Sequence, residues 1–149
     1  FSGDPVKMVS TGGIAVAAAG DTLLGVFRGV QYTDSSGDVI FQSHYVTATA
    51  ADDMVALVED DPNSLFEVQC DGSMATTAIG NNADMATYAA GSTKTGMSAV
   101  EISSTTGTGT AQFRIVGFSQ DPSNSTTGSA NINVVVKINE HFYAAAAGV

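Results

Sequence analysis

One segment near the C-terminal end of the chain limits the fold more than any other. Residues 131–143 read NINVVVKINEHFY, a run without glycine or proline in which valine and isoleucine predominate. These β-branched residues favour extended backbone, and a strand needs neighbouring strands to satisfy its N–H and C=O groups. Because successive side chains of a strand point to opposite faces, Val134, Val136 and Ile138 would share one face. The run predicts a long strand inside a sheet.

Short apolar runs recur along the whole chain, separated by glycine, proline, asparagine and aspartate. Turn signals about every 8 to 12 residues are typical of a β-sandwich or a barrel. No break in composition divides the 149 residues. We therefore predict one all-β domain over residues 1–149, a compact β-barrel or β-sandwich. Its strands would cover residues 6–9, 14–18, 23–32, 39–46, 54–58, 65–71, 99–102, 112–118 and 131–143.

The segments between these strands give further expectations. Two long loops rich in Ser, Thr and Gly occupy residues 103–110 and 121–128. At most two short helical turns are expected, the main one between Thr76 and Ala90, where Gly80 prevents a longer helix. The turn residues at 59–63 would join the strand at 54–58 to an antiparallel partner at 65–71.

Two strands carry additional signals. In residues 23–32, the internal glycines Gly25 and Gly29 indicate a bulge or a close approach of another backbone. Residues 54–58 are continuously apolar, which predicts a strand buried on both faces. The only cysteine, Cys70, fits a small hydrophobic core residue and excludes an intramolecular disulfide. The predicted core consists of Val26, Val30, Val55, Leu57, Phe66, Val68, Phe113, Ile115, Val134 and Val136.

The charge balance limits the classes of partner. Fifteen acidic residues against five basic ones give a net charge of −10, and the basic residues are scattered singly. Phosphate binding requires clustered lysine and arginine, which argues against nucleic acid and anionic lipid as partners. No apolar run approaches the ~18 residues of a membrane span, so no membrane partner is expected. Since the chain opens with Phe1 rather than methionine, we expect an N-terminal arm upstream of this residue.

Candidate catalytic and metal-binding residues are few. His44, His141 and Cys70 could serve in acid–base or nucleophilic chemistry, but no Gly-x-Ser-x-Gly elbow or other activating device accompanies them. The acidic pairs at 52–53 and 59–61 could supply oxygen ligands for Ca²⁺, although neither follows the spaced Asp-x-Asp-x-Asp-Gly pattern. We predict no catalytic residue, cofactor or metal site, and favour ordinary turns for the acidic pairs.

Several segments taken in chain order resemble one known group of proteins. They are FSGDPVK at 1–7, AGDTLLGVFRGVQYTD at 19–34, VALVEDDP at 55–62, LFEVQ at 65–69, GMSAVEI at 96–102 and VKINEH at 136–141. This series is similar to virion structural proteins of tailed bacteriophages, specifically head decoration (cement) proteins. The resemblance spans nearly the whole chain. Members of that group usually carry an N-terminal arm before the Gly-Asp-Pro-Val position, which this sequence lacks.

The resemblance implies a structural role. The protein would lie on the outer surface of the virion, bind the major capsid protein and stabilise the expanded head through many modest contacts. It would assemble there as a dimer or a trimer and would not be an enzyme. The alternatives are another virion or surface module, such as a tail or fibre component, and, less favoured, a small-ligand binder or an enzyme. Because large aromatic side chains anchor many interfaces, the contact residues are expected to include His141, Phe142, Tyr143 and Tyr45.

Overall fold

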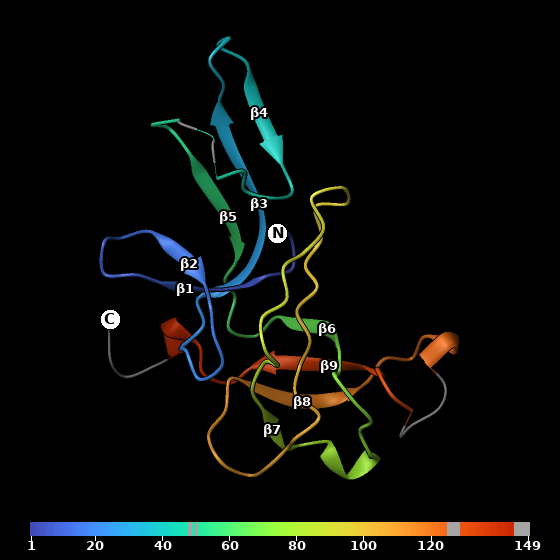
Figure 1. The fold of residues 1–149 in the computed structure, drawn as a ribbon. Helices are drawn as coiled ribbons and strands as arrows, with labels where there is room; N and C mark the ends of the chain where they lie inside the picture. The colour runs from blue at the N-terminus through green and yellow to red at the C-terminus, as the bar shows by residue number, and fades with distance from the viewer. Residues whose placement is uncertain (48, 50, 125–128, 145–149) are drawn as a thin grey trace.

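The two sheets of the fold are both antiparallel. A computed structural model describes residues 1–47, 49, 51–124 and 129–144, and this part of the chain holds nine strands and no helix longer than a single 3₁₀ turn (Figure 1). The all-β prediction is confirmed, and the sheets do not close into a barrel. No helix among the described residues is long and apolar enough to cross a membrane.

The first sheet is built around β3 (Gly25–Thr33), its longest strand. The start of β3 pairs with β1 (Pro5–Met8) on one side, and residues 26–31 of β3 pair with β5 (Val55–Glu59) on the other. The outer edge of β1 pairs with β2 (Ile14–Val16), while β4 (Val39–Gln42) forms a hairpin with the second half of β3. Across the first half of β3 the strand order is therefore β2-β1-β3-β5.

The second sheet has the order β6-β9-β8-β7. Its strands are β6 (Leu65–Gln69), β7 (Asn82–Ala83), β8 (Phe113–Phe118) and β9 (Asn133–Ile138). The C-terminal strand is confirmed and pairs on both sides, with Val134, Val136 and Ile138 buried on one face. It is shorter than predicted, because Asn131 has a positive φ of 57° and the chain turns into η3 (Phe142–Ala144) after it.

Both glycines of β3 have the predicted roles. The register of β3 against β5 shifts between Phe27 and Gly29, which is a β-bulge. Gly25 lies directly against the backbone carbonyl of Glu59, so a Cβ atom there would overlap that carbonyl.

Two local predictions are wrong. The turn after Glu59 does not form a hairpin: it carries the chain from the first sheet to the second, so β5 pairs with β3 while β6 pairs with β9. Residues 99–102 form no strand, and Ile102 makes only isolated bridges to Cys70 and Met85. The predicted helical turn between Thr76 and Ala90 is confirmed as a single 3₁₀ turn, η1 (Thr76–Ala78), which is followed by β7.

The described part of the chain contains two further 3₁₀ turns, η2 (Pro122–Asn124) and the η3 turn just named. Residues 103–110 form the predicted loop, apart from a bridge between Gly107 and Asn82. The later part of the predicted loop at 121–128 lies outside the described residues.

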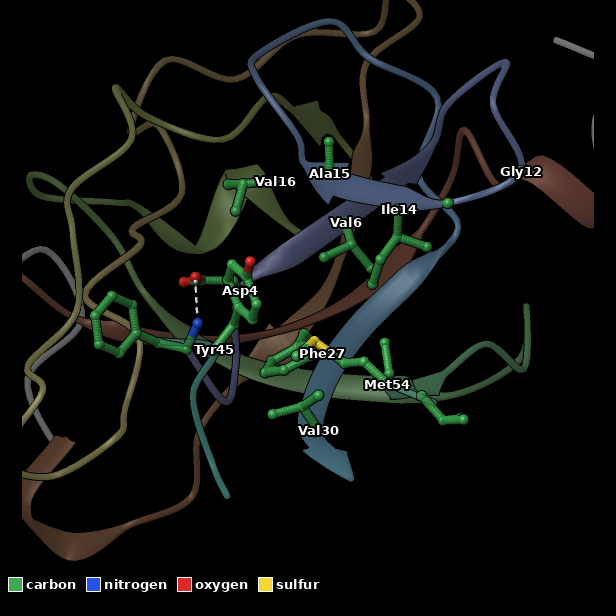
Figure 2. A pocket seen from close by; sticks show the side chains of 14 residues that line it. Asp4, Val6, Gly12, Ile14, Ala15, Val16, Phe27, Val30, Tyr45 and Met54 are labelled. Atoms are coloured by element: carbon green, nitrogen blue, oxygen red, sulfur yellow. Dashed lines mark hydrogen bonds and ion pairs between the residues drawn. The ribbon is translucent and has the colours of Figure 1, made fainter. Parts of the chain in front are cut away.

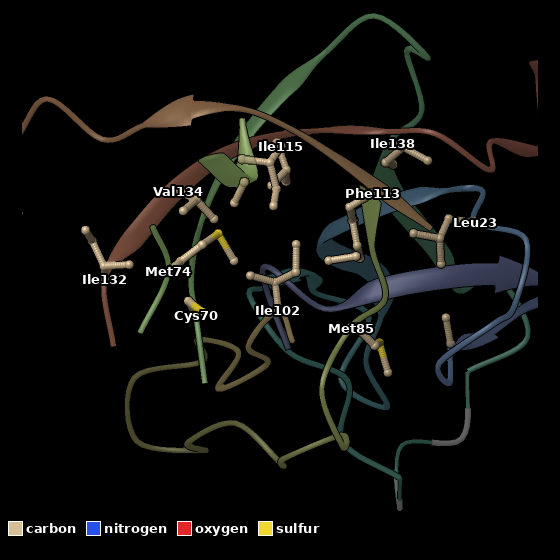
Figure 3. Packing of buried hydrophobic residues seen from close by; sticks show 14 residues of the cluster. Leu23, Cys70, Met74, Met85, Ile102, Phe113, Ile115, Ile132, Val134 and Ile138 are labelled. Carbon is tan, nitrogen blue, oxygen red and sulfur yellow. The ribbon is translucent and has the colours of Figure 1, made fainter. Parts of the chain in front are cut away.

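Apolar side chains gather in two clusters. The larger lies against one face of the second sheet and includes Cys70, Phe113, Ile115 and Val136, which confirms the core role of Cys70 (Figure 3). The smaller lies on the first sheet and contains Val6, Phe27, Val30 and Tyr32.

Most of the predicted core is confirmed, with two exceptions. Val26, Val30, Phe113, Ile115, Val134 and Val136 are buried, and Phe66 and Val68 are partly buried. Val55 and Leu57 are 56% and 37% exposed. The continuous apolar run of β5 therefore does not mark a strand covered on both faces, since nothing in the described chain covers the face that carries these two side chains.

Candidate functional site

A cavity of about 780 Å³ opens on the first sheet. One side is formed by residues 12–16, which include β2, and the other by Met54, Val55 and Ala56 at the start of β5. Val6 of β1 and Phe27 and Val30 of β3 form its floor (Figure 2). Since β2 and β5 are the two end strands of the order β2-β1-β3-β5, the sheet curls until both ends border one space. We call the opening between these ends the β2–β5 seam.

The outer edge of β2 is a free strand edge within the described chain. The amide of Ala17 donates to the carbonyl of Pro5 and that of Val9 to Gly13, which fixes the alternation of the β1–β2 ladder. In an antiparallel pair this alternation turns the N–H and C=O groups of Ile14 and Val16 away from β1. No bond among the described residues outside the ladders engages them.

The outer edge of β5 is free in the same sense. The Asp34 amide donates to the Asp38 carbonyl, so the ladder alternation turns the backbone groups of Val30 toward β4. The neighbouring residues of β3, Gly29 and Gln31, then form backbone hydrogen bonds with Leu57 and Val55 of β5. Ala56 and Val58 consequently direct their N–H and C=O groups outward, toward the seam.

A buried carboxylate lines the same cavity. Asp4 is 1% exposed, and its Oδ2 atom forms an ion pair with the N-terminal ammonium of Phe1 at 2.8 Å and accepts a hydrogen bond from the hydroxyl of Tyr88 at 3.4 Å. Burial, and then the charge of Asp4, raises the pKa of Tyr88, which keeps this hydroxyl protonated and able to donate. The Oδ1 atom of Asp4 has no partner among the described residues. An unpartnered acceptor inside a largely apolar cavity is a polar group that a ligand could satisfy.

A second feature is an exposed apolar face formed by β3, β4 and β5, which meets the border of the cavity at Val55. Gln31 of β3 pairs with Phe41 of β4 on one side and with Val55 of β5 on the other, so the three side chains lie on one face of the sheet. Val39 and Leu57 extend this face along β4 and β5. Val39 is 68%, Phe41 62% and Val55 56% exposed. We call Val39, Phe41, Val55 and Leu57 the β4–β5 face. Exposed apolar clusters of this kind mark interaction sites more often than single exposed residues do.

Three of the four predicted interface residues, His141, Phe142 and Tyr143, lie together, whereas Tyr45 lines the cavity. Phe142 and Tyr143 lie in η3 beyond β9, with their rings 5.4 Å apart in an edge-on arrangement, and Tyr143 is 61% exposed. Tyr45 is 49% exposed and lines the cavity on the first sheet. His141 is 1% exposed, so its side chain reaches no partner surface in this conformation, because the chain around it pairs with Leu23.

The buried surroundings of His141 affect its charge. Desolvation lowers the pKa of this imidazole below its ordinary value of 6.5, although the nearby Asp60 carboxylate acts in the opposite direction. The Nδ1 atom accepts a hydrogen bond from the Tyr143 amide, whereas Nε2 is buried without a partner among the described residues.

The other candidates for chemistry lie apart from one another. His44 stacks on Phe1 with ring centroids 5.7 Å apart, while Cys70 is buried in the larger core. Burial raises the pKa of the Cys70 thiol, which keeps it in the less reactive form. Asp53 accepts two hydrogen bonds from Thr33, and these bonds lower its pKa. Among the described residues there is no group of three or more side chains suited to hold a metal ion.

The sequence reasoning missed both the β4–β5 face and the role of Asp4. The signal for the face was the apolar run at residues 39–41, which carries a hydrophobic side chain on each side of the strand. Asp4 lies between glycine and proline and therefore fitted a turn residue rather than a buried acid. Comparison with protein-family models, curated proteins and solved structures found no match.

Proposed function

We propose that this protein is a bacteriophage capsid decoration protein that binds the outer surface of the major capsid protein and stabilises the expanded head as a dimer or a trimer. The proposal is motivated by the resemblance of several segments, taken in chain order, to head decoration proteins of tailed bacteriophages. The β4–β5 face is the structural observation that supports it best, because it offers an apolar contact surface on a chain that otherwise carries strong negative charge.

The surroundings of this face indicate the chemistry of the contact. Asp38 precedes β4, Asp52 and Asp53 precede β5, and all three are exposed. A complementary surface would have an apolar centre bordered by lysine or arginine. The same negative charge disfavours a symmetric contact in which two copies of this face meet directly.

The direct test adds purified protein to expanded capsid shells that lack any decoration protein and counts the bound copies. A decoration protein should saturate in a fixed ratio to the capsid protein and should raise the temperature at which the shells rupture, because binding stabilises the bound state. Binding only at the tail vertex or a fibre would favour the alternative structural role. No binding to any part of the particle would refute the proposal.

Phe41→Asp is the variant that tests the face. It places a charge at the centre of the β4–β5 face and should weaken shell binding by about 30-fold or more, since loss of an aromatic anchor costs about 2 kcal/mol or more. Val116→Asp is the matched control, because Val116 is also an exposed strand residue, 46% accessible, but lies on the second sheet. Tyr143→Ser tests the competing contact at η3. If only Tyr143→Ser weakens binding, the shell contacts the C-terminal aromatics and not the β4–β5 face.

A further inference from the structure

The two free strand edges, the cavity between them and the unpartnered Asp4 oxygen belong to one site. We propose that the β2–β5 seam binds an extended segment of the capsid protein that carries one lysine or arginine, whose side chain crosses the cavity to Asp4. The inference rests on the proposed function only for the identity of the chain that supplies the segment.

The backbone of the two free strand edges, those of β2 and β5, favours the binding of an extended peptide. Both strand edges that border the seam direct N–H and C=O groups toward it, and these groups have no described backbone partner. On the β2 edge they belong to Ile14 and Val16, and on the β5 edge to Ala56 and Val58. A strand placed between the two edges could form backbone hydrogen bonds with one or both of them, which is the way many domains bind partner segments. A small ligand would leave these rows of donors and acceptors unused.

The floor of the cavity determines which side chains fit. Val6, Phe27 and Val30 are at most 6% exposed, and Ile14 and Met54 pack beside them. Alternate side chains of the bound segment would point toward this floor, since successive residues of a strand face opposite sides. Those side chains should be apolar, and the aliphatic part of a lysine or arginine is compatible with the same surface.

Asp4 determines the charge of the segment. Its Oδ1 atom lies in a nearly solvent-free position and has no partner in the described chain, whereas Oδ2 already holds the Phe1 ammonium. A buried carboxylate is stabilised most by a cationic donor, and such charge-assisted bonds are stronger than neutral ones. A carboxylate of an acidic segment could not donate a hydrogen bond to Oδ1.

The test uses a defined peptide with the ¹⁵N-labelled protein. The probe is N-acetyl-Thr-Val-Thr-Lys-Thr-Val-Thr-amide, in which two valines and the lysine share one face when the peptide is extended. Saturable chemical-shift changes are expected at the amides of Ile14, Val16, Ala56 and Val58. Replacing the lysine with norleucine should weaken binding at least tenfold, and N-methylation of three alternate amides should abolish it.

Two protein variants separate the parts of the site. Asp4→Asn should weaken the lysine peptide at least tenfold and leave the norleucine peptide unchanged, while Glu67→Gln, the same charge change on an exposed residue of β6, should alter neither. If Asp4→Asn fails to fold, Ala56→Leu, which adds bulk inside the cavity, should block both peptides with Asp4 intact.

The outcomes distinguish this inference from the proposed function. Absence of saturable shifts, shifts confined to other strands, or equal affinity for the lysine and norleucine peptides would overturn the seam as a site for a basic segment. Undiminished shell binding by Ala56→Leu would also overturn it while leaving the decoration role intact. Peptide binding by a protein that ignores capsid shells would refute the decoration role and keep the seam as a peptide site.

Discussion

The contrast between Ile115 and Leu57 tests whether the buried face of β8 contributes more to stability than the exposed face of β5. Both residues lie inside strands and both are large aliphatic side chains. Ile115 is fully buried in β8, whereas Leu57 in β5 is 37% exposed on the β4–β5 face. Truncating each to alanine removes three carbon atoms, so the chemistry of the change is the same and only the surroundings differ.

The expected losses of unfolding free energy follow from burial. At ~0.8 kcal/mol per buried carbon, the lost transfer free energy of Ile115→Ala is about 2.4 kcal/mol, and the cavity left in a packed core brings the total to about 3 to 5 kcal/mol. Leu57→Ala loses only about 60% of its transfer term, roughly 1.5 kcal/mol, and leaves an open depression instead of an enclosed cavity. The two losses should therefore differ by about 2 kcal/mol.

Urea unfolding followed by circular dichroism measures both values on one scale. The slope of free energy against urea should be equal for the wild type and both variants, which shows that the same structure unfolds. A loss for Leu57→Ala as large as that for Ile115→Ala would refute the reasoning, because it would mean that the β4–β5 face is covered in the isolated protein. A loss below about 1 kcal/mol at Ile115 would contradict the assigned core.

Three further predictions concern single positions. Gly25→Ala should destabilise the protein by about 1 to 3 kcal/mol in the same urea assay, because its methyl group overlaps the Glu59 carbonyl, whereas Gly109→Ala, with open space around it, should have little effect. Cys70 should react with a thiol reagent only after unfolding, and rapid reaction in native buffer would contradict its burial. The folded-state pKa of His141 lies below 6.5, so the contribution of the neutral imidazole to stability is present above pH 6.5 and is lost as the pH falls through the folded-state pKa. The melting temperature should therefore fall with pH in this range, and His141→Asn should remove this contribution to the pH dependence.

Strands β8 and β9 of the second sheet could be predicted because their sequence pattern and their surroundings agree, whereas the two-residue strand β7 was not predicted. In β8 and β9, buried residues alternate with less buried ones, and this period of two is what the sequence shows. The same reasoning failed at β5, where the apolar run means a strand with one covered and one exposed face. Periodicity reports which side chains are apolar and cannot report whether another chain covers them.

Other features depend on how the elements are placed in space. The Asp-Pro-Asn turn after β5 has the same local chemistry whether it closes a hairpin or leads to another sheet, so the partner of β6 could not be deduced from it. The β2–β5 seam arises from the curl of a whole sheet, and the two strands that border it lie about 40 positions apart in the chain. The role of Asp4 could be recognised only once the fold placed it in the lining of that cavity.

The central position of β9 has a consequence for how the protein forms during synthesis. The strands of the first sheet are all complete by Glu59, so that sheet can assemble early. The second sheet cannot, because β6 and β8 each pair with β9, which is made after both. Until residue 138 leaves the ribosome, β6 has no described strand partner and the larger core has an open side. A polypeptide interrupted before β9 would expose strand edges beside apolar side chains, the combination that promotes aggregation.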